Sequence, residues 1–444
     1  MMEVAFLLLL FVLEIAFSVY TIMDGRDRGV WYQKRMFVRG IELISFFLFM
    51  LLPAVHFGFR FALCVSLLVI RFILALIFWL CKRNGENKIL KTGSIIWRLA
   101  GSLALFFFAM IPAFVFTGYQ GIDTTGEYQV KQVHAILVDD SRVESFEEDG
   151  SKREVPVYIY YPDTGEGEFP LVVFSHGAFG YYQSNTSTYM ELASNGYVVV
   201  SVEHPYHSFF TEDTSGKTII VDMGFLQEVQ YANEDTTSLD ETIEMSSKWL
   251  AIRTEDMNFA IDSIKTAKDS GSLNDEWYTK EPEDKDEILK VISMADTEKI
   301  GVMGHSLGGA SSVELGRTRD DIDAVIDLDG TMLGERTVNE EPYPVPLLAI
   351  DNEEHHQTSV EYGTDYVNVA VLENAKDGRN TYFAGSGHMN FTDLPLFSPL
   401  LAGMLGTGSI DSESCIRQTN EIVLQYYNYY LKDEGEITLQ ECYE

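Results

Sequence analysis

Hydrophobic residues are arranged in two different ways along this chain of 444 residues. Up to about residue 118 they form four long apolar stretches, each near the roughly twenty residues that a helix needs to cross a hydrocarbon core. After residue 118 the apolar runs are short, and polar segments separate them. The chain is therefore expected to join four membrane spans to a region of a different kind. The predicted spans are Val4–Met23, Val38–Phe59, Phe61–Leu80 and Ile95–Gly118.

The short apolar runs of the second region predict strands, with helical segments between them. Val155–Tyr161 alternates and ends at a proline, whereas Trp249–Ile264 repeats its apolar residues at helical spacing. This alternation indicates an α/β fold, in which helices cover both faces of a mostly parallel sheet and the functional site lies at the carboxyl ends of the strands. Further expected strands are Leu171–Ser175, Tyr197–Val202, Ile300–Met303, Ala324–Leu328, Pro346–Ile350 and Asn380–Ala384, and Glu421–Leu431 is expected to be a closing helix.

The charge distribution places the boundary between the two regions near Tyr119. Residues 1–118 contain 12 Lys and Arg against 6 Asp and Glu, whereas residues 119–444 contain 20 against 61. We therefore divide the chain into a four-span transmembrane region, 1–118, and a globular domain, 119–444. The formal net charge of −35 argues against nucleic acid as a partner, because phosphate backbones attract basic surfaces. The sequence gives no indication of oligomeric state.

Lys and Arg residues also predict how the spans are oriented. The loops after the first and third spans are rich in these residues, whereas the loop between the second and third spans has only Arg60. Because positive loops stay in the cytoplasm, domain 119–444 is expected to lie outside the cytoplasm, anchored to a cell membrane by a multi-pass region. Glu14, Glu42 and Arg71 lie within the predicted spans, and structural pairing is favoured over a functional role for them.

The chemistry of the second region centres on Lys299–Ser312, KIGVMGHSLGGASS. A short apolar strand leads into Gly304–Gly308, which fits the G-x-S-x-G pattern of a nucleophile elbow. A serine on such a turn has a strained backbone, and its neighbours must be small because the strand and the helix approach closely. Ser306 is therefore the candidate nucleophile, and a glycine-rich structural turn is the alternative.

A serine nucleophile needs a base, and the base needs an acid that orients it. His388, in the small-residue loop GSGHMNF after the last strand, is the candidate base among nine histidines. Asp329 follows one predicted strand, Ala324–Leu328, and Asp351 follows the next, Pro346–Ile350. Both aspartates satisfy the chain order serine, acid, histidine, so the residues alone leave the choice of acid open.

Acyl transfer also needs hydrogen-bond donors for the oxyanion. The strand that ends at Ser175 runs into a glycine turn, and the backbone N–H of Ala178 in this turn is expected to act together with that of Leu307. His176 is expected to support the turn by hydrogen bonding.

Four cysteines without C-x-x-C spacing, and histidines without a ligand pattern, predict neither a metal site nor a cofactor. Cys415 and Cys442 form either a disulfide or two separate thiols. The polar stretch between His207 and Lys248 forms either a lid over the pocket or a solvated insertion.

Several motifs together resemble the platelet-activating-factor acetylhydrolase family, the plasma and intracellular-type serine lipases. They are LVVFSHG (171–177), LASNGYVVVSVEHPYHS (192–208), GHSLGGASS (304–312), LDGTM (328–332) and GHMNF (387–391). The resemblance extends from about Val155 to Leu431 and implies the α/β-hydrolase fold. The four-span region lies outside it and resembles an architecture of bacterial members.

The predicted spans and the resemblance together imply a membrane-anchored serine carboxylic-ester hydrolase that uses no cofactor. Its substrate would be a short-chain or lipid ester of the 1-alkyl-2-acetylglycerophosphocholine kind. Phe is usual in the family at the position of Leu307 and Trp near that of Thr331, so the acyl pocket should differ while hydrolysis is retained. An acyltransferase with the same triad, or a catalytically silent membrane receptor or accessory protein, are the alternatives. The implied roles are Ser306 as nucleophile, Asp329 as acid, His388 as base, and Ala178 and Leu307 as oxyanion-hole residues.

Overall fold

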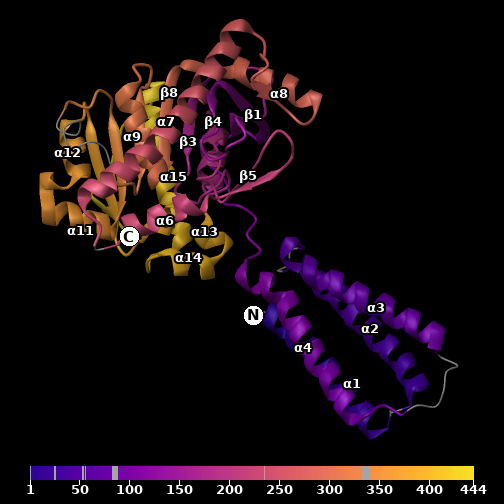
Figure 1. Ribbon diagram of the computed structural model, residues 1–444. Helices are drawn as coiled ribbons and strands as arrows, with labels where there is room; N and C mark the ends of the chain where they lie inside the picture. The colour runs from indigo at the N-terminus through magenta and orange to yellow at the C-terminus, as the bar shows by residue number, and fades with distance from the viewer. Residues whose placement is uncertain are drawn as a thin grey trace. The chain divides into compact units, whose positions relative to one another are not determined.

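The chain consists of two compact units, which Figure 1 shows as a helical part and a larger mixed part. The computed structural model describes residues 2–24, 27–52, 55, 57–82, 89–234, 236–332 and 341–444. The first unit contains residues 1–120 together with 396–401, and the second contains 121–395 and 402–444.

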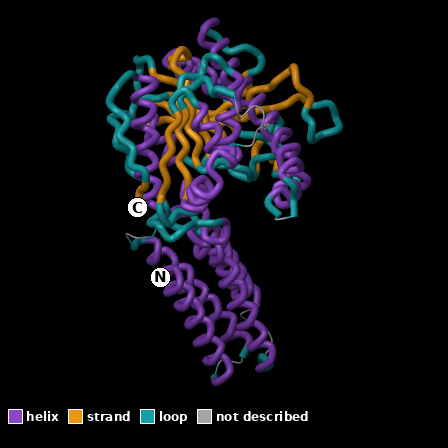
Figure 2. The backbone as a smooth tube through the Cα atoms, turned by 90° about the vertical axis from the view of Figure 1, so that its left-hand side faces the viewer, coloured by secondary structure: helices purple, strands orange, loops and turns teal. Residues whose placement is uncertain are grey.

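The first unit is built from four long helices that lie side by side (Figures 1 and 2). They are α1 (Met2–Met23), α2 (Arg28–Met50), α3 (Ala62–Lys82) and α4 (Thr92–Val115), and the short 3₁₀ helix η1 (Phe59–Phe61) precedes α3. Their shared core is rich in aromatic rings: Phe6, Phe46, Phe61 and Phe106 are all almost completely buried. The helices therefore hold one another through apolar packing as well as through polar contacts.

Within the described residues of this unit, three segments are long and apolar enough to cross a membrane, namely Met2–Met23, Phe59–Lys82 and Thr92–Val115. The predicted span Val38–Phe59 has the wrong bounds, because α2 begins at Arg28 and ends at Met50. That shift brings several basic residues into α2, and they lower its hydropathy below that of the other three helices.

The charges inside these helices pair with one another. Glu14 of α1 accepts hydrogen bonds from Arg39 of α2 and Arg71 of α3, and Arg39 also binds Glu42. Arg71 reaches Ser102 of α4 at 3.1 Å. All five side chains are buried. The network thus connects all four helices and leaves each buried charge with an opposite charge beside it.

The second unit contains a ten-stranded sheet with the order β12-β11-β10-β9-β8-β3-β4-β2-β1-β7. The seven strands from β12 to β4 are parallel, and β2, β1 and β7 extend the sheet by antiparallel pairing. The α/β prediction is confirmed. The strands are β1 (Val130–Val143), β2 (Lys152–Pro162), β3 (Phe169–Ser175), β4 (Val198–Val202), β7 (Trp277–Tyr278), β8 (Ala295–His305), β9 (Ala324–Leu328), β10 (Leu347–Asn352), β11 (Gly378–Phe383) and β12 (Cys442–Tyr443).

Alternate residues of the strands feed two separate cores. In β3, Leu171 and Val173 join the core under α7, α8 and α9, whereas Val172 and Phe174 join the core under α5 and α15. Helices thus cover both faces of the sheet, as Figure 2 shows. The helices are α5 (Thr186–Ser194), α7 (Leu239–Ser270), α8 (Pro282–Met294), α9 (Leu307–Thr318), α11 (Glu353–Tyr362), α12 (Val367–Asn374), α13 (Leu394–Phe397), α14 (Pro399–Leu405) and α15 (Ser412–Lys432), with 3₁₀ helices η2 (Gly363–Asp365) and η3 (His388–Phe391).

The polar stretch between His207 and Lys248 is structured. It forms a two-stranded hairpin, β5 (Phe210–Glu212) with β6 (Thr218–Ile220), followed by α6 (Met223–Ala232) and the start of α7. Cys415 and Cys442 are free thiols.

Candidate active site

Ser306 stands on a sharp turn between β8 and α9. Its φ of 56° and ψ of −125° lie in a region that non-glycine residues seldom adopt, and its N–H is held by the carbonyl of Leu328 at 2.9 Å. The flanking glycines allow this geometry: a Cβ on Gly308 would lie 2.0 Å from the carbonyl oxygen of Ser175. The side chain of Ser306 is partly exposed. The sequence GHSLG thus forms a strained elbow that presents the hydroxyl at the carboxyl end of the sheet.

Asp329 and His388, which are 59 residues apart in the sequence, meet beside this elbow. Nδ1 of His388 lies 2.6 Å from Oδ2 of Asp329. Because an ionised carboxylate only accepts hydrogen bonds, Nδ1 carries the proton and Nε2 is left as an acceptor. The Asp329 side chain is fully buried, whereas that of His388 is 36 % exposed. The arrangement is that of an orienting acid and an accessible base.

Additional donors hold the Asp329 carboxylate. Asn352 donates its backbone N–H to Oδ1 at 2.7 Å and its side-chain amide to Oδ2 at 2.9 Å, and Nδ1 of His355 lies 3.1 Å from Oδ1. Burial alone would raise the pKa of Asp329, but its contacts with His355 and His388 hold that pKa well below the usual value. Asp329 is therefore an anion at neutral pH.

Asp351, the other aspartate that satisfies the chain order, has no contact with His388 among the described hydrogen bonds and ion pairs. Its Oδ2 accepts from the side chain of Asn380 at 2.7 Å, and its Oδ1 has no partner within the described residues. Burial, reinforced by the neighbouring charge of Asp329, raises the pKa of Asp351 to about 7. The geometry thus places Asp329, and not Asp351, against the candidate base.

One potential ligand atom from each of Asp329, Asp351 and His355 lies within 4.8 Å of the other two, which is close enough for a shared cation. A metal ion there would compete with His388 for Asp329. His355 already supplies positive charge at this place: burial would lower its pKa, but the nearby carboxylates, Asp329 foremost, raise it to about 9.

The elbow and the candidate base are neighbours through His305. Nε2 of His305 lies 3.0 Å from the carbonyl oxygen of His388, and the two imidazole rings are 4.5 Å apart. No hydrogen bond joins the hydroxyl of Ser306 to His388 in the described part of the chain. Such bonds are often long in enzymes without substrate, and the unbonded hydroxyl is free to meet a ligand.

The predicted oxyanion turn lies against the nucleophile. A Cβ on Gly177 would lie 3.3 Å from the Cβ of Ser306. Among the described contacts, neither the N–H of Ala178 nor that of Leu307 donates to a protein acceptor. Two unbonded backbone donors, one on this turn and one at the N-terminus of α9, are what an oxyanion hole requires.

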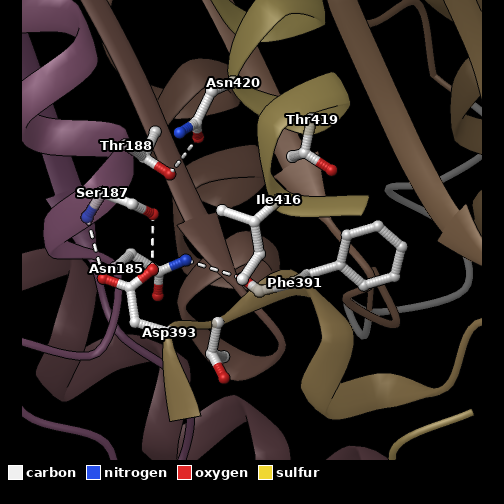
Figure 3. Close-up of a pocket in the computed structure, with 9 residues that line it drawn as sticks. Asn185, Ser187, Thr188, Phe391, Asp393, Ile416, Thr419 and Asn420 are labelled. Carbon is white, nitrogen blue, oxygen red and sulfur yellow. Dashed lines mark hydrogen bonds between the residues drawn. The ribbon is translucent and has the colours of Figure 1, made fainter. Parts of the chain in front are cut away.

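The loop that carries His388 is tied to the N-terminus of α5, as Figure 3 shows. Asn185 donates to the carbonyl of Phe391 at 2.6 Å, and Asp393 accepts the backbone N–H of Ser187 at 2.8 Å. The pocket drawn there lies between α5, η3 and α15 and does not include Ser306. Its hydrogen bonds fix the position of η3, which begins at His388.

Sequence reasoning assigned no role at the site to Asn352, His355 or Arg253, all of which contact the site or its supporting turn. Asn352 is the last residue of β10 and His355 lies three residues later, so the rule that sites collect at strand ends could have found them. Arg253 lies in the middle of α7, many residues away in the sequence from any strand end, and no sequence signal marks it.

Comparison with known proteins shows what the chain is similar to. The family description "Platelet-activating factor acetylhydrolase, isoform II" matches residues 146–440. The chain is similar to proteins named platelet-activating factor acetylhydrolase from Canis lupus familiaris, with 24 % identity over 279 residues, and from Cavia porcellus, with 26 % identity over 281 residues. Each alignment covers 60 % of this chain and 58 % of the relative, so the chain spans less than two thirds of the length of these relatives.

A solved structure supports the fold. The ferulic acid esterase from Streptomyces cinnamoneus superposes with a TM-score of 0.52 at 20 % identity, covering 72 % of this chain and 95 % of that one. At this identity the likeness concerns the fold, which is that of the α/β hydrolases, as the resemblance implied. Because the family description matches about two thirds of the sequence, the chain belongs to the platelet-activating factor acetylhydrolase, isoform II, family.

Proposed function

We propose that this chain is a membrane-anchored serine hydrolase that cleaves carboxylic esters. The observation that carries the proposal is the 2.6 Å contact between His388 and the buried Asp329, beside a serine on a strained elbow. Family membership and the esterase-like fold point the same way. A serine, a base and an acid in these positions serve acyl transfer through a covalent acyl-enzyme.

The mechanism follows from the tautomer of His388. Its Nε2 takes the proton of Ser306 while Oγ adds to the ester carbonyl, and the resulting oxyanion binds the N–H groups of Ala178 and Leu307. The protonated imidazole then gives its proton to the leaving alkoxide. Water attacks the acyl-enzyme in the same way and releases the acid. Throughout, Asp329 stays ionised and stabilises the imidazolium.

We propose a short-chain lipid ester as the substrate. The names of the relatives refer to an acetyl group on platelet-activating factor, and a membrane-anchored enzyme meets lipids at high local concentration. Hydrolysis of a graded series of p-nitrophenyl esters, from acetate to longer chains, should be fastest for the shortest members.

A fluorophosphonate probe tests the reaction class. Wild-type protein should be labelled on Ser306, and Ser306→Ala should not be labelled. Absence of labelling in the wild type, or labelling that survives the substitution, would contradict the serine-hydrolase proposal. Adding a primary alcohol as a competing acceptor then separates hydrolysis from transfer, since a hydrolase should yield mainly free acid.

We propose that all four long helices, including α2, cross the membrane. The buried charges of α2 do not argue against a span, because Arg39 and Glu42 form a nearly solvent-free network with Glu14 and Arg71. Four spans and basic loops on one side would leave the hydrolase unit outside the cytoplasm.

The topology can be tested with single cysteines in a variant whose four native cysteines are replaced by serine. A cysteine at exposed Asp240 of the hydrolase unit should react with a membrane-impermeant maleimide in intact cells. A cysteine at exposed Lys82, at the end of α3, should react only after the membrane is permeabilised. The reverse pattern would overturn the proposed orientation.

A further inference from the structure

A second serine, histidine and aspartate lie together behind the oxyanion turn. Ser175 Oγ is 2.9 Å from Nε2 of His204, and Nδ1 of His204 is 3.0 Å from Oδ2 of Asp256. All three side chains are fully buried. No ester can reach this serine, so the group calls for an explanation other than hydrolysis.

The hydrogen bonds of this group run in one direction. Burial alone would raise the pKa of Asp256, but Arg153, which donates two hydrogen bonds to its carboxylate, holds that pKa far below the usual value. The ionised carboxylate accepts from Nδ1–H of His204, and Nε2 then accepts from the hydroxyl of Ser175. Burial lowers the pKa of His204 to about 4, so the ring is neutral and this tautomer is fixed. With its proton committed to His204, Ser175 presents a lone pair to a further donor.

That donor is Arg253, an arginine of α7 with no exposed surface. Nη1 lies 3.3 Å from Ser175 Oγ and also donates to the carbonyl of His176, while Nη2 lies 3.3 Å from the carbonyl of Gly177. Its Nε lies 3.4 Å from Nδ1 of His207. Every nitrogen of the planar guanidinium thus contacts a residue that forms the oxyanion turn or lies beside it.

The carbonyl of Gly177 belongs to the same peptide unit as the N–H of Ala178. In a planar trans peptide these two groups point in opposite directions. A donor that fixes the carbonyl on one side therefore fixes the N–H on the other. Nδ1–H of His176 donates to the same carbonyl at 2.7 Å, and the turn is strained at Phe179, whose φ is 61°. The hydrogen bonds to the Gly177 carbonyl thus hold the strained turn on one side, and the N–H of Ala178 faces the other side, where the oxyanion would bind.

We propose that Arg253 is a positioning residue that aims the N–H of Ala178 at the oxyanion, and that Ser175, His204 and Asp256 hold Arg253 in place. This inference rests on the proposed function. Arg253 touches no reacting atom, since two carbonyls stand between it and the site. Its contribution is to keep the donor oriented before the charge develops, which is how a preformed oxyanion hole accelerates acyl transfer.

Arg253→Met in the full chain removes the donors while keeping an unbranched, buried side chain. We expect kcat on p-nitrophenyl acetate to fall about 100-fold with little change in KM, because an oxyanion donor acts in the transition state. Affinity for a trifluoromethyl ketone should fall by a similar factor. That ketone reports on the same donor, because Ser306 Oγ adds to its carbonyl, the serine proton passes to His388, and the carbonyl oxygen becomes an oxyanion. Arg253→Lys, which retains one donor, should lose about tenfold in both measurements.

Arg319→Met is the matched control. Arg319 is also largely buried and binds α7 through Asn258 and Asp262, but it has no described contact with the oxyanion turn. The Arg319→Met substitution should lower the melting temperature while kcat stays within about twofold of wild type.

If Arg253→Met does not fold, the Arg253→Lys variant provides the test. A kcat and a ketone affinity equal to those of wild type in the Arg253→Lys variant would overturn the inference. Equal losses of kcat in the Arg253→Met and Arg319→Met proteins would also overturn it. A wild-type chain that reacts with neither the fluorophosphonate nor the ketone would instead refute the proposed function, and this inference with it.

Discussion

Two serine–histidine–aspartate groups lie on opposite sides of the oxyanion turn, and only one of them is arranged for chemistry. In the buried group, Ser175 sits in the regular strand β3, and its hydroxyl is committed to His204 at 2.9 Å. In the other, Ser306 sits on a strained elbow, and no described residue accepts its hydroxyl proton. Residue types are the same in both groups, but the chain order is serine, histidine, aspartate in the buried group and serine, aspartate, histidine in the other. Ser306, the proposed nucleophile, thus differs from Ser175 in lying partly exposed on a strained backbone, which leaves its hydroxyl free for a substrate.

The surroundings of the two aspartates differ just as much. Arg153 and Arg142 bind Asp256, and the contacts with Arg153 keep it ionised. Asp329 has two buried carboxylates as neighbours, Asp327 and Asp351, and burial and mutual repulsion raise the pKa values of both. The buried group thus combines ion pairs with full burial, whereas the Asp329 carboxylate, which we propose stabilises a transient imidazolium, lies beside two carboxyl groups whose protonated forms are favoured.

Replacing each serine in turn tests most directly whether only Ser306 is needed for the reaction. Ser306→Ala should lower kcat on p-nitrophenyl acetate by about 10⁶-fold, as expected when a nucleophile is lost. Ser175→Ala should lower kcat by less than about tenfold, because Arg253 keeps its bonds to the two carbonyls. Steady-state kinetics on both purified variants measure this. A loss of several orders of magnitude with Ser175→Ala would mean that the buried group takes part in the reaction directly.

The two aspartates near the base give the next largest contrast. Asp329→Asn should lower kcat by about 10⁴-fold, because an amide at this position favours the wrong tautomer of His388. Asp351→Asn should lower kcat by less than about tenfold, since Asp351 contacts Asn380 and not the base. Single-turnover acylation rates separate this effect from changes in substrate binding. If the Asp351 variant were the slower of the two, the assignment of the acid would be wrong.

Much of the site could be predicted from local sequence, because its residues lie directly after strands. Ser306, Asp329 and His388 follow β8, β9 and β11, and the parallel sheet brings these ends together. The choice between Asp329 and Asp351 could not be made in this way, since both follow adjacent strands and face the same region. Only the 2.6 Å contact with His388 distinguishes them in space.

Other features were beyond sequence reasoning for physical reasons. Strand β1 was not predicted, because one of its faces is exposed and its apolar pattern is diluted by polar residues. Helix α2 begins earlier than the hydropathy indicates, since Glu14 of α1 neutralises Arg39. Arg253 carries no local signature at all, because its role depends on a turn 76 residues earlier in the chain.

The buried group should be critical for stability rather than for chemistry. Asp256→Asn leaves the charges of Arg153 and Arg142 buried with less compensation, and we expect a loss of about 3–5 kcal/mol in the free energy of unfolding. Asp262→Asn, on the same helix, should cost less than about 1 kcal/mol because Asp262 is mostly exposed. Denaturant unfolding of both variants in the same detergent checks this. Equal losses would show that the Asp256 network is no more important than a surface ion pair.

The pH dependence of stability tests whether Asp351 is protonated beside the ionised Asp329. The unfolded chain ionises Asp351 near pH 4, whereas burial and the charge of Asp329 raise its pKa in the folded state to about 7. Between these values the folded state binds more protons than the unfolded state, so Asp351 makes wild type lose stability as the pH rises. Asp351→Asn removes this dependence. Relative to wild type, the variant should therefore gain stability from pH 4 to pH 7, by at most about 1.4 kcal/mol per pH unit. If the difference in unfolding free energy between the variant and wild type did not change over this range, Asp351 would be ionised in the folded protein. The repulsion between Asp351 and Asp329 that the structure indicates would then be absent.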